Sequence, residues 1–268
     1  QGRLSPMLGE KIQAFPWLNW RNEIETAGHI DINLMEWTID QADLYENPLM
    51  TLDGRKEISS LCQEHGLSIT SLTGDCFMQS PFWKTSDFDL CNKLKADFIA
   101  VTQACSEIGI EIVVVPLVDN GRLNTQKQED NLVNFLFQQN ERLKDLDIKI
   151  AFESDFSPYE LKRFISRFES KTFGVNYDIG NSAALGFDPT EEFSAYGDQI
   201  LNVHVKDRIL SGTTVPLGSG SADFSKVFSL LKSINYNSNY ILQTARAADG
   251  EHANLICEYK KFVQDGIN

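Results

Sequence analysis

Residues 148–207 decide the fold, because they contain three short runs typical of β-strands, separated by segments that are not strand-like. The runs are IKIAFES (148–154), TFGVNYDI (172–179) and ILNVHVKD (200–207). Each is rich in β-branched or aromatic residues and is bounded by turn-forming residues. Each also carries a side chain that can bind a metal near its C-terminal end: Glu153, Asp178 and His204. The same stretch therefore bears on both the fold and the function.

Strand-like and helix-like segments alternate along almost the whole chain. Further strands are expected at 32–39, 67–74, 110–118 and 240–245. Helices, with apolar residues recurring at spacings of three and four, are expected at 87–109, 129–146, 157–170, 222–234 and 252–265. N-cap residues are expected at Asp87, Ser157, Asp188 and Ser221. The alternation predicts an α/β fold, a single (β/α)8 TIM barrel over residues 1–268.

An eight-stranded barrel needs one strand more than the seven runs found. The chain begins with QGRLSP, which resembles the loop that follows a first strand. We therefore expect the first strand to be short, missing or upstream of residue 1. The alternative fold is an open doubly wound sheet. No glycine-rich phosphate-binding turn follows an early strand, so the barrel is favoured.

The alternation of residues along the three central runs indicates which side chains point into the barrel. In each run one face is bulky and apolar, whereas the other is small or polar and includes Glu153, Asp178 or His204. Successive side chains point to opposite faces, and the apolar outer face of a barrel packs beneath its helices. A barrel interior is normally filled by bulky aliphatic side chains, so a polar interior indicates a site. Singly, each residue could be structural, as a core histidine, a turn cap or an ion-pair partner.

The chemistry of these residues indicates a divalent cation. Carboxylates and imidazole together suit Mn²⁺, Zn²⁺, Co²⁺ or Mg²⁺. A fourth residue, Gln243 in YILQTAR, lies at the end of the last expected strand. It can offer only a neutral carbonyl oxygen and cannot accept a proton. The fourth position of the expected ligand set therefore lacks a charge.

Composition excludes some partners. The chain of 268 residues carries a net charge of −14, which repels nucleic-acid backbones and anionic membranes. No apolar run approaches the length of a membrane span. The five cysteines form no CxxC pair, and nothing resembles a signal peptide, so reduced thiols in a cytoplasm are expected. The chain could also form a homo-oligomer.

Longer motifs carry a resemblance to a known family. Glu153 at a strand end, D-I-G-N at 178–181 and H-V-K-D at 204–207 resemble the xylose isomerase-like barrels of the sugar-phosphate isomerase/epimerase superfamily. The segment PLGSGSADF (216–224) resembles the P-x-G-x-G-x-x-D-F segment of that superfamily. The resemblance is nearest to the L-ribulose-5-phosphate 3-epimerase and hexulose-phosphate isomerase branch. It covers nearly the whole chain, although the sharp motifs lie in residues 148–246.

The resemblance implies one divalent metal ion, Mn²⁺ or Zn²⁺ before Mg²⁺ or Co²⁺, held by Glu, Asp, His and a second Glu. It implies an isomerase or epimerase that acts on a small sugar or sugar phosphate through an enediolate intermediate. In the epimerases the two glutamates move the proton. Carried over to this chain, Glu153 is a ligand and the base, Asp178 and His204 are ligands, and Gln243 takes the place of the second Glu.

Gln243 puts two-base epimerisation in doubt, because it cannot take up a proton. Isomerisation with Glu153 as the single base needs no second carboxylate. Glu36, near the end of the run at 32–39, is expected to be either an alternative acid/base or a salt-bridge partner. The alternatives are a keto-inositol or sugar dehydratase on the same barrel and a sugar-binding barrel without catalysis. A relative of apurinic-site endonucleases is disfavoured, because the chain has only four histidines and is acidic.

Substrate contacts are expected on the same rim. Lys206 shares the inward face with His204 and is expected to pair with a carboxylate or to hold a substrate oxygen. Asn181 belongs to the D-I-G-N motif, and Arg246 lies three residues beyond Gln243 at the mouth, where it could bind an anion. Backbone N–H groups around Ser219 and Gly220 precede a helix and are expected to form an anion cradle. Asp207 faces the other way and is expected to orient this loop.

Overall fold

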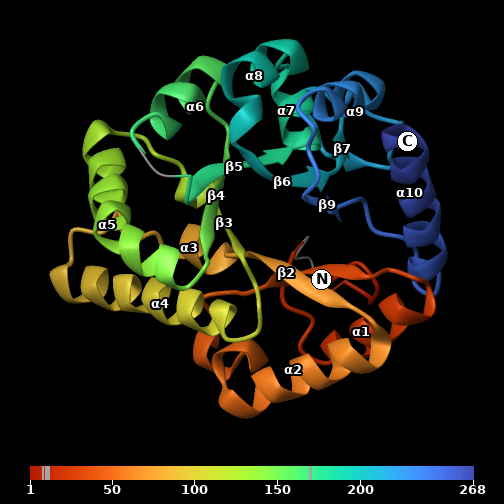
Figure 1. The fold of residues 1–268 in the computed structure, drawn as a ribbon, viewed down its shortest axis with the longest axis horizontal. Coiled ribbons are helices and arrows are strands. Elements are labelled where there is room, and N and C mark those ends of the chain that lie inside the picture. Colours follow the sequence, from red (N-terminus) through yellow and green to blue (C-terminus); the bar gives the residue numbers. More distant parts are fainter. Residues whose placement is uncertain (8, 10–12, 169–170) are drawn as a thin grey trace.

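In the computed structural model, residues 1–7, 9, 13–168 and 171–268 are described. Seven parallel strands form one sheet in the order of the chain. They are β1 (Leu34–Thr38), β2 (Ser68–Thr73), β3 (Ile112–Leu117), β4 (Lys149–Ser154), β5 (Phe173–Asp178), β6 (Ile200–Val205) and β9 (Asn239–Leu242). Figure 1 shows the helices arranged around this curved sheet. All seven expected strands are confirmed, and the fold is the predicted TIM barrel with a nearly closed sheet.

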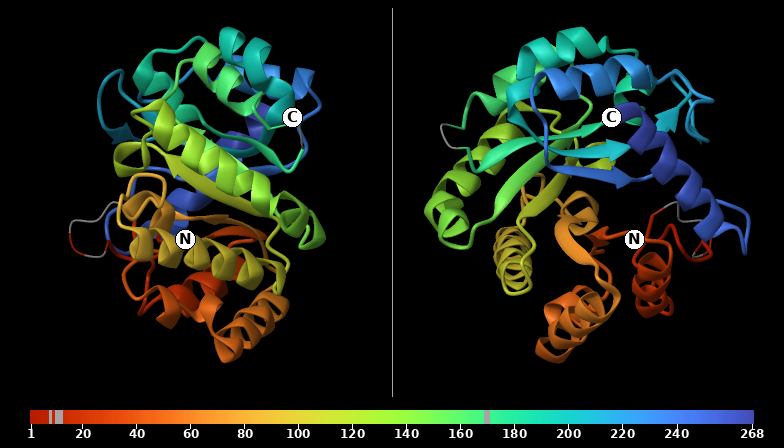
Figure 2. Two further views of the ribbon diagram at one scale, coloured as in Figure 1. Left: turned by 90° about the vertical axis from the view of Figure 1, so that its left-hand side faces the viewer. Right: turned by 45° about the vertical axis from the view of Figure 1, so that its right-hand side comes forward.

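Helices follow most strands and cover the outside of the sheet, as both views in Figure 2 show. They are α1 (Trp20–His29), α2 (Leu52–His65), α3 (Asp75–Gln79), α4 (Phe88–Ser106), α5 (Gln126–Asp145), α6 (Pro158–Ile165), α7 (Ile179–Leu185), α8 (Pro189–Tyr196), α9 (Phe224–Ser233) and α10 (His252–Ile267). A short antiparallel pair, β7 (Asp207–Arg208) and β8 (Thr214–Val215), follows β6. No described helix is long and apolar enough to cross a membrane.

The outer face of the sheet carries the apolar core, as the residue alternation predicts. Phe152 on β4 packs edge-on against Phe164 of α6, with ring centroids 5.0 Å apart. It also lies beside Phe168 and Phe173, and all four rings are buried. Removing apolar surface from water is the main favourable term in such packing. With Phe152 outside, the neighbouring Glu153 points into the barrel.

Three of the four expected N-caps are confirmed. Asp87 accepts a hydrogen bond from Leu90 N, Asp188 accepts one from Thr190 N, and Ser157 forms a capping box with Glu160. The expectation for Ser221 is wrong, because Asp223 is the N-cap of α9. The reason is local: the Ser221 hydroxyl accepts a hydrogen bond from Leu210 N and so belongs to the preceding loop.

The sheet stays open between β9 and β1, which do not pair with each other. The first residues of the chain cross this gap. The α-amino group of Gln1 donates to Glu36 O at 2.9 Å, and the Gln1 side chain accepts from Thr38 N. Arg3 donates to Thr244 O on the other side at 2.9 Å. An eighth strand is therefore not present among the described residues, and the N-terminal segment lies in its place.

Candidate functional site

Glu153, Asp178 and His204 lie together at the C-terminal ends of β4, β5 and β6. The register of β5 and β6 places Asp178 directly beside His204. One potential ligand atom from each residue lies within 4.8 Å of the other two. His204 Nδ1 is 3.2 Å from Glu153 Oε2 and 3.8 Å from Asp178 Oδ2. All three side chains are buried, so the structure brings together the three residues that the sequence singled out.

The His204 ring is oriented by Glu36. Its Nε2 lies 2.8 Å from Glu36 Oε1, which leaves Nδ1 on the side of Glu153 and Asp178. A carboxylate behind a ligating histidine sets both the ring orientation and the tautomer in metal sites. Here the neutral ring would carry its proton on Nε2 and present the Nδ1 lone pair to the carboxylates.

Glu36 itself is fully hydrogen-bonded. Besides His204, its oxygens accept hydrogen bonds from Ser71, Thr73 and Asn202. Burial by itself would raise the pKa of Glu36, but His204 and the two hydroxyls outweigh burial and lower that pKa to about 2. Four donors use the acceptor capacity of the carboxylate. Of the two roles expected for Glu36, this geometry matches the salt-bridge partner and leaves no acceptor for a substrate proton.

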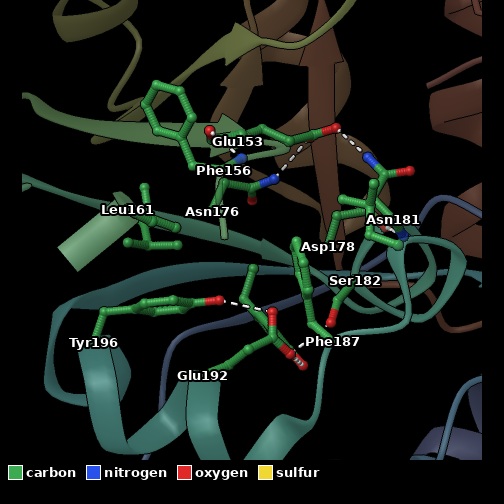
Figure 3. A pocket seen from close by; sticks show the side chains of 14 residues that line it. Glu153, Phe156, Leu161, Asn176, Asp178, Asn181, Ser182, Phe187, Glu192 and Tyr196 are labelled. Carbon is green, nitrogen blue, oxygen red and sulfur yellow. Dashed lines mark hydrogen bonds between the residues drawn. The ribbon is translucent and has the colours of Figure 1, made fainter. Parts of the chain in front are cut away.

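Polar residues one layer below tie the cluster together. Asn176 on β5 donates to Glu153 Oε2 at 2.9 Å and accepts from Asn202 on β6 at 2.8 Å. Above them, Asn181 donates through its side chain to Glu153 Oε1 at 2.8 Å and through its backbone to Asp178 Oδ1. The Asn176 and Asn181 contacts with Glu153 are visible in Figure 3. Glu153 is thus held from two sides.

The electrostatics of the cluster favour ionised carboxylates. Burial opposes ionisation of Glu153, but His204 and Lys206 outweigh it and lower the pKa of Glu153. Burial also lowers the pKa of His204, yet the facing Glu36 and Glu153 carboxylates raise that pKa to about 10. Lys206 pairs with Asp178 Oδ2 at 2.6 Å, one of the partners expected for it. The ionised carboxylates of the cluster are thus stabilised by the cationic His204 and Lys206.

Gln243 follows β9 and lies beside the end of β6, since its N–H donates to Val205 O at 3.1 Å. Its side-chain amide donates to Gln13 Oε1 at 2.9 Å. The Gln243 carbonyl oxygen is buried and has no hydrogen-bond partner within the described residues. A buried carbonyl oxygen normally finds a partner. This one remains available to a ligand.

A second carboxylate network lies beyond Gln243 and was not anticipated. Gln13 donates to Asp75 Oδ2 at 3.0 Å, and Asp75 follows the end of β2. Burial, together with the nearby Asp40 carboxylate, raises the pKa of Asp75 to about 7. An aspartate directly after a strand at the C-terminal rim was the available sequence signal. The pairing with Gln13, 62 positions earlier, was not visible in the sequence.

The loop after β7 and β8 differs from the expected anion cradle. Asp207 accepts hydrogen bonds from the backbone N–H groups of Gly218, Gly220 and Ala222. The Gly220 amide is therefore already hydrogen-bonded to the Asp207 side chain. The expectation that Ser219 and Gly220 form an anion cradle is corrected accordingly. A Cβ on Gly220 would lie 2.2 Å from Asp207 Oδ1, so only glycine fits. The expectation that Asp207 orients this loop is confirmed.

The two arginines of the rim have protein partners. Arg246 Nη1 donates to Ser5 O at 3.2 Å and is half-buried. Arg208 Nη1 donates to Asn181 Oδ1 at 2.9 Å, which links it to the residue that holds Glu153. Arg208 therefore lies next to the cluster, whereas Arg246 contacts the N-terminal segment.

A cavity of about 20 Å³ beside the cluster is lined by Glu153, Asp178 and Asn181 on one side and by Glu192 and Tyr196 on the other. Figure 3 shows these side chains facing one another. Glu192 accepts hydrogen bonds from the hydroxyls of Tyr177, Ser182 and Tyr196. This buried carboxylate ties α8 to β5 and α7 and so fixes the backbone that carries Asp178.

Comparison with known proteins places the fold in a family. The family model described as xylose isomerase-like TIM barrel matches residues 24–258. The chain is 24% identical over 243 residues to L-ribulose-5-phosphate 3-epimerase UlaE of Escherichia coli O1:K1 / APEC, covering 84% of this chain and 81% of that protein. The relatives that carry this name support enzyme activity at the level of the superfamily.

Two solved structures have the same fold. D-psicose 3-epimerase from Clostridium cellulolyticum H10, determined with D-tagatose, superposes with a TM-score of 0.74 at 12% identity, covering 93% of this chain and 94% of that one. The IOLI protein with a zinc atom superposes with a TM-score of 0.72 at 18% identity, covering 93% of each chain. At these identities the likeness concerns the fold. With the family model spanning most of its length, this chain belongs to the xylose isomerase-like TIM barrel family.

Proposed function

We propose that this protein is a divalent-metal-dependent isomerase or epimerase of a small sugar or sugar phosphate. The observation that carries the proposal is the convergence of Glu153, Asp178 and His204 at the C-terminal ends of three adjacent strands. That rim is where barrels of this class place their active sites. The names of the relative UlaE and of the D-psicose epimerase agree with sugar chemistry.

The residues present fit a divalent cation. Glu153, Asp178 and Nδ1 of His204 would hold it, and the buried, unpartnered Gln243 carbonyl oxygen would be the fourth ligand. Oxygen and imidazole donors in this combination suit Mn²⁺ or Zn²⁺. When bound, such an ion supplies Lewis-acid polarisation of a substrate carbonyl and hydroxyl. The Glu153 and Asp178 carboxylates would balance the two positive charges of the ion, so this ligand set would be neutral without a third carboxylate at the position of Gln243.

Glu153 would be the base that removes the proton from the carbon beside the substrate carbonyl, which leaves an enediolate. Asn176 and Asn181 hold its two oxygens, at 2.9 Å and 2.8 Å, so the carboxylate is already oriented before substrate arrives. Gln243 cannot receive a proton. The proton would therefore return from Glu153 on the same face, which is the pattern of a one-base isomerisation.

Substrate oxygens would be held by side chains on the same rim. Lys206 and Asn181 already touch Asp178 and Glu153. Arg208, paired with Asn181, is better placed for a phosphate or a sugar hydroxyl than the loop amides that Asp207 occupies. Arg246 would contribute from the mouth. A phosphorylated substrate would thus rely on guanidinium groups, which bind phosphate through paired hydrogen bonds.

The test is exchange of a substrate carbon-bound hydrogen with D2O, measured by NMR over a panel of ketoses and ketose phosphates after loading with Mn²⁺ or Zn²⁺. Glu153→Gln should abolish exchange while keeping most of the bound metal, because the amide oxygen still ligates. Glu141→Gln, on the exposed face of α5, is the control and should exchange normally. Exchange that persists in Glu153→Gln would mean that another group is the base.

A dehydratase on the same barrel is the second candidate, and Gln243 is the observation that favours it. Enolisation by Glu153 is the first step of both reactions, but a dehydratase needs no second base on the opposite face at the same carbon. Mass spectrometry of the products separates the two. A product that has lost one water identifies a dehydratase, whereas a product of unchanged mass identifies an isomerase.

A further inference from the structure

Gln243, Gln13 and Asp75 form a hydrogen-bonded chain at the rim of the barrel, from the end of β9 to the end of β2. The Gln243 side-chain amide donates to Gln13 Oε1 at 2.9 Å, and the Gln13 amide donates to Asp75 Oδ2 at 3.0 Å. Asp75 is the first residue of α3, directly after β2. Side chains from three distant parts of the sequence therefore form one connected element.

The direction of these hydrogen bonds is set at Asp75. An ionised carboxylate has no proton to donate, and a protonated one keeps a carbonyl oxygen that can only accept. Gln13 therefore turns its NH2 group toward Asp75 and its oxygen toward Gln243. Because that oxygen can only accept, Gln243 must offer its own NH2 group to Gln13. The other end of the Gln243 amide is the buried carbonyl oxygen, which has no hydrogen-bond partner within the described residues.

Asp40, two residues after β1, holds both supports of this chain in place. It accepts a hydrogen bond at 2.9 Å from the backbone N–H of Phe15, two residues beyond Gln13. It accepts a second at 2.6 Å from the side chain of Gln79, the last residue of the short helix that begins with Asp75. Phe15 is fully buried. One carboxylate thus fixes the loop of Gln13 and the helix of Asp75 relative to each other, which reduces the entropy lost when the side chains are held.

The orientation of Gln243 matters because the two ends of an amide offer opposite things to a cation. The carbonyl oxygen can ligate it, whereas the NH2 group is a donor and repels it. A glutamate at this position would have two equivalent oxygens, either of which could ligate. A glutamine has one, so some other group must decide which end of the amide faces the metal ligands.

We propose that Asp75, acting through Gln13, is a positioning residue that turns the carbonyl oxygen of Gln243 toward the metal-ligand cluster. This inference rests on the proposed function, because it takes Gln243 as the neutral fourth ligand of a divalent cation. In this role Asp75 touches neither the cation nor the substrate. The charge that Gln243 lacks is supplied by a carboxylate two hydrogen bonds away, which polarises both amides and makes their oxygens stronger acceptors.

The test is the Zn²⁺ affinity of the full chain, measured by competition with a chelator, in two variants that both remove the charge of Asp75. Asp75→Asn keeps an oxygen that can accept from Gln13, whereas Asp75→Leu keeps none. Asp75→Leu should bind Zn²⁺ roughly tenfold more weakly than Asp75→Asn, at the low end of the loss typical for partners of a metal ligand. In a Gln243→Leu background the two changes should give equal affinity, because the ligand that they orient is gone.

Gln13→Met gives an independent check if Asp75→Leu does not fold. Methionine keeps the length of the side chain but forms neither hydrogen bond, so Zn²⁺ affinity should again fall roughly tenfold. In the Gln243→Leu background, Gln13→Met should have no further effect. The control is Gln126→Met, which changes an exposed glutamine at the start of α5 and should bind Zn²⁺ as the native protein does.

Equal affinity in the two Asp75 variants, or native affinity in Gln13→Met, would overturn the inference but leave the proposed function standing. Losses that persist in the Gln243→Leu background would also overturn it, because Asp75 and Gln13 would then act on the fold rather than on this ligand. A native protein that binds no Zn²⁺ would instead overturn the proposed function, and the inference with it.

Discussion

His204 Nε2 lies 2.8 Å from Glu36 Oε1, although the two residues are 168 positions apart in the chain. The contact spans the barrel interior, from β6 to β1. It turns Nδ1 of His204 toward Glu153 and Asp178 and so decides which nitrogen would bind a metal. Glu36 thus acts on the candidate site through His204 rather than by contact with the ligand position.

Replacing Glu36 should weaken metal binding without removing a ligand. In Glu36→Gln the charge behind His204 is lost, so the ring is less basic, and we expect Zn²⁺ affinity to fall roughly 10–100-fold. Competition with a chelator measures the affinity. The matched control is Glu129→Gln, which removes a buried carboxylate paired with Arg163 and Arg167 far from the site. If Zn²⁺ affinity falls equally in the two variants, the effect is due to lower protein stability alone.

Metal binding should release a proton near neutral pH. The Glu36 and Glu153 carboxylates raise the pKa of His204 to about 10, so the ring is protonated in the metal-free protein at pH 7.5. A ligating imidazole must be neutral, and apparent affinity should rise about tenfold per pH unit below that pKa. Calorimetry in buffers of different ionisation enthalpy counts the protons. An enthalpy that is identical in all buffers would contradict this assignment.

Gln243→Glu should strengthen metal binding, because it adds a third carboxylate to the ligand set. A new charge a few ångströms from the ion should raise affinity by roughly tenfold or more. Gln243→Leu, which removes the carbonyl oxygen at similar volume, should lower it. The same two variants can be assayed for 3-epimerisation of ketoses. If Gln243→Glu gains this activity, the native protein does not use a second base at this position. If both variants bind metal as the native protein does, Gln243 is not a ligand.

Asp75 should make the protein less stable as pH rises. Its pKa is about 7 in the folded state and close to 4 in the unfolded chain, so the folded state holds the proton more tightly. The contribution of the protonated Asp75 to folding stability is fully present below about pH 4, and it is lost as the pH rises through about 7. Asp75→Asn should therefore gain roughly 2–4 kcal/mol relative to the native protein between pH 5 and pH 8.

Urea unfolding at both pH values measures this difference. The control is Asp53→Asn, which removes an exposed aspartate from the first turn of α2. A difference between Asp75→Asn and the native protein that stays constant with pH would show that Asp75 ionises normally. If the stability difference between Asp75→Asn and the native protein instead grows toward low pH, folding lowers the pKa of Asp75 and the prediction is wrong.

Local patterns in the sequence predicted the helices and strands, because interactions between residues close together in the chain determine where these form. The β-branched run at 110–118 and the capping box at Ser157 act within a few residues. The alternation around Phe152 and Glu153 also follows from strand geometry alone. Ser221 was the one expected N-cap that was wrong, because Asp223, two positions later, caps α9 instead.

Interactions between loops could not be inferred in this way. The Gly-rich segment at 216–222 has the composition of a loop that binds an anion. In the structure, the Asp207 carboxylate already accepts the hydrogen bonds of its backbone N–H groups. The link from Gln243 through Gln13 to Asp75 joins residues from opposite ends of the chain. No spacing rule relates such positions, because their proximity depends on how far the sheet has closed.

By itself, the sequence determined the order of strands and helices, the inward direction of Glu153, Asp178 and His204, and the neutral character of Gln243. These follow from side-chain periodicity and chemistry, which are properties of single residues and their neighbours. Only the tertiary structure decided that Glu36 orients His204 and that a gap remains between β9 and β1. Both depend on closing the sheet, which brings the first and last strands together across the barrel.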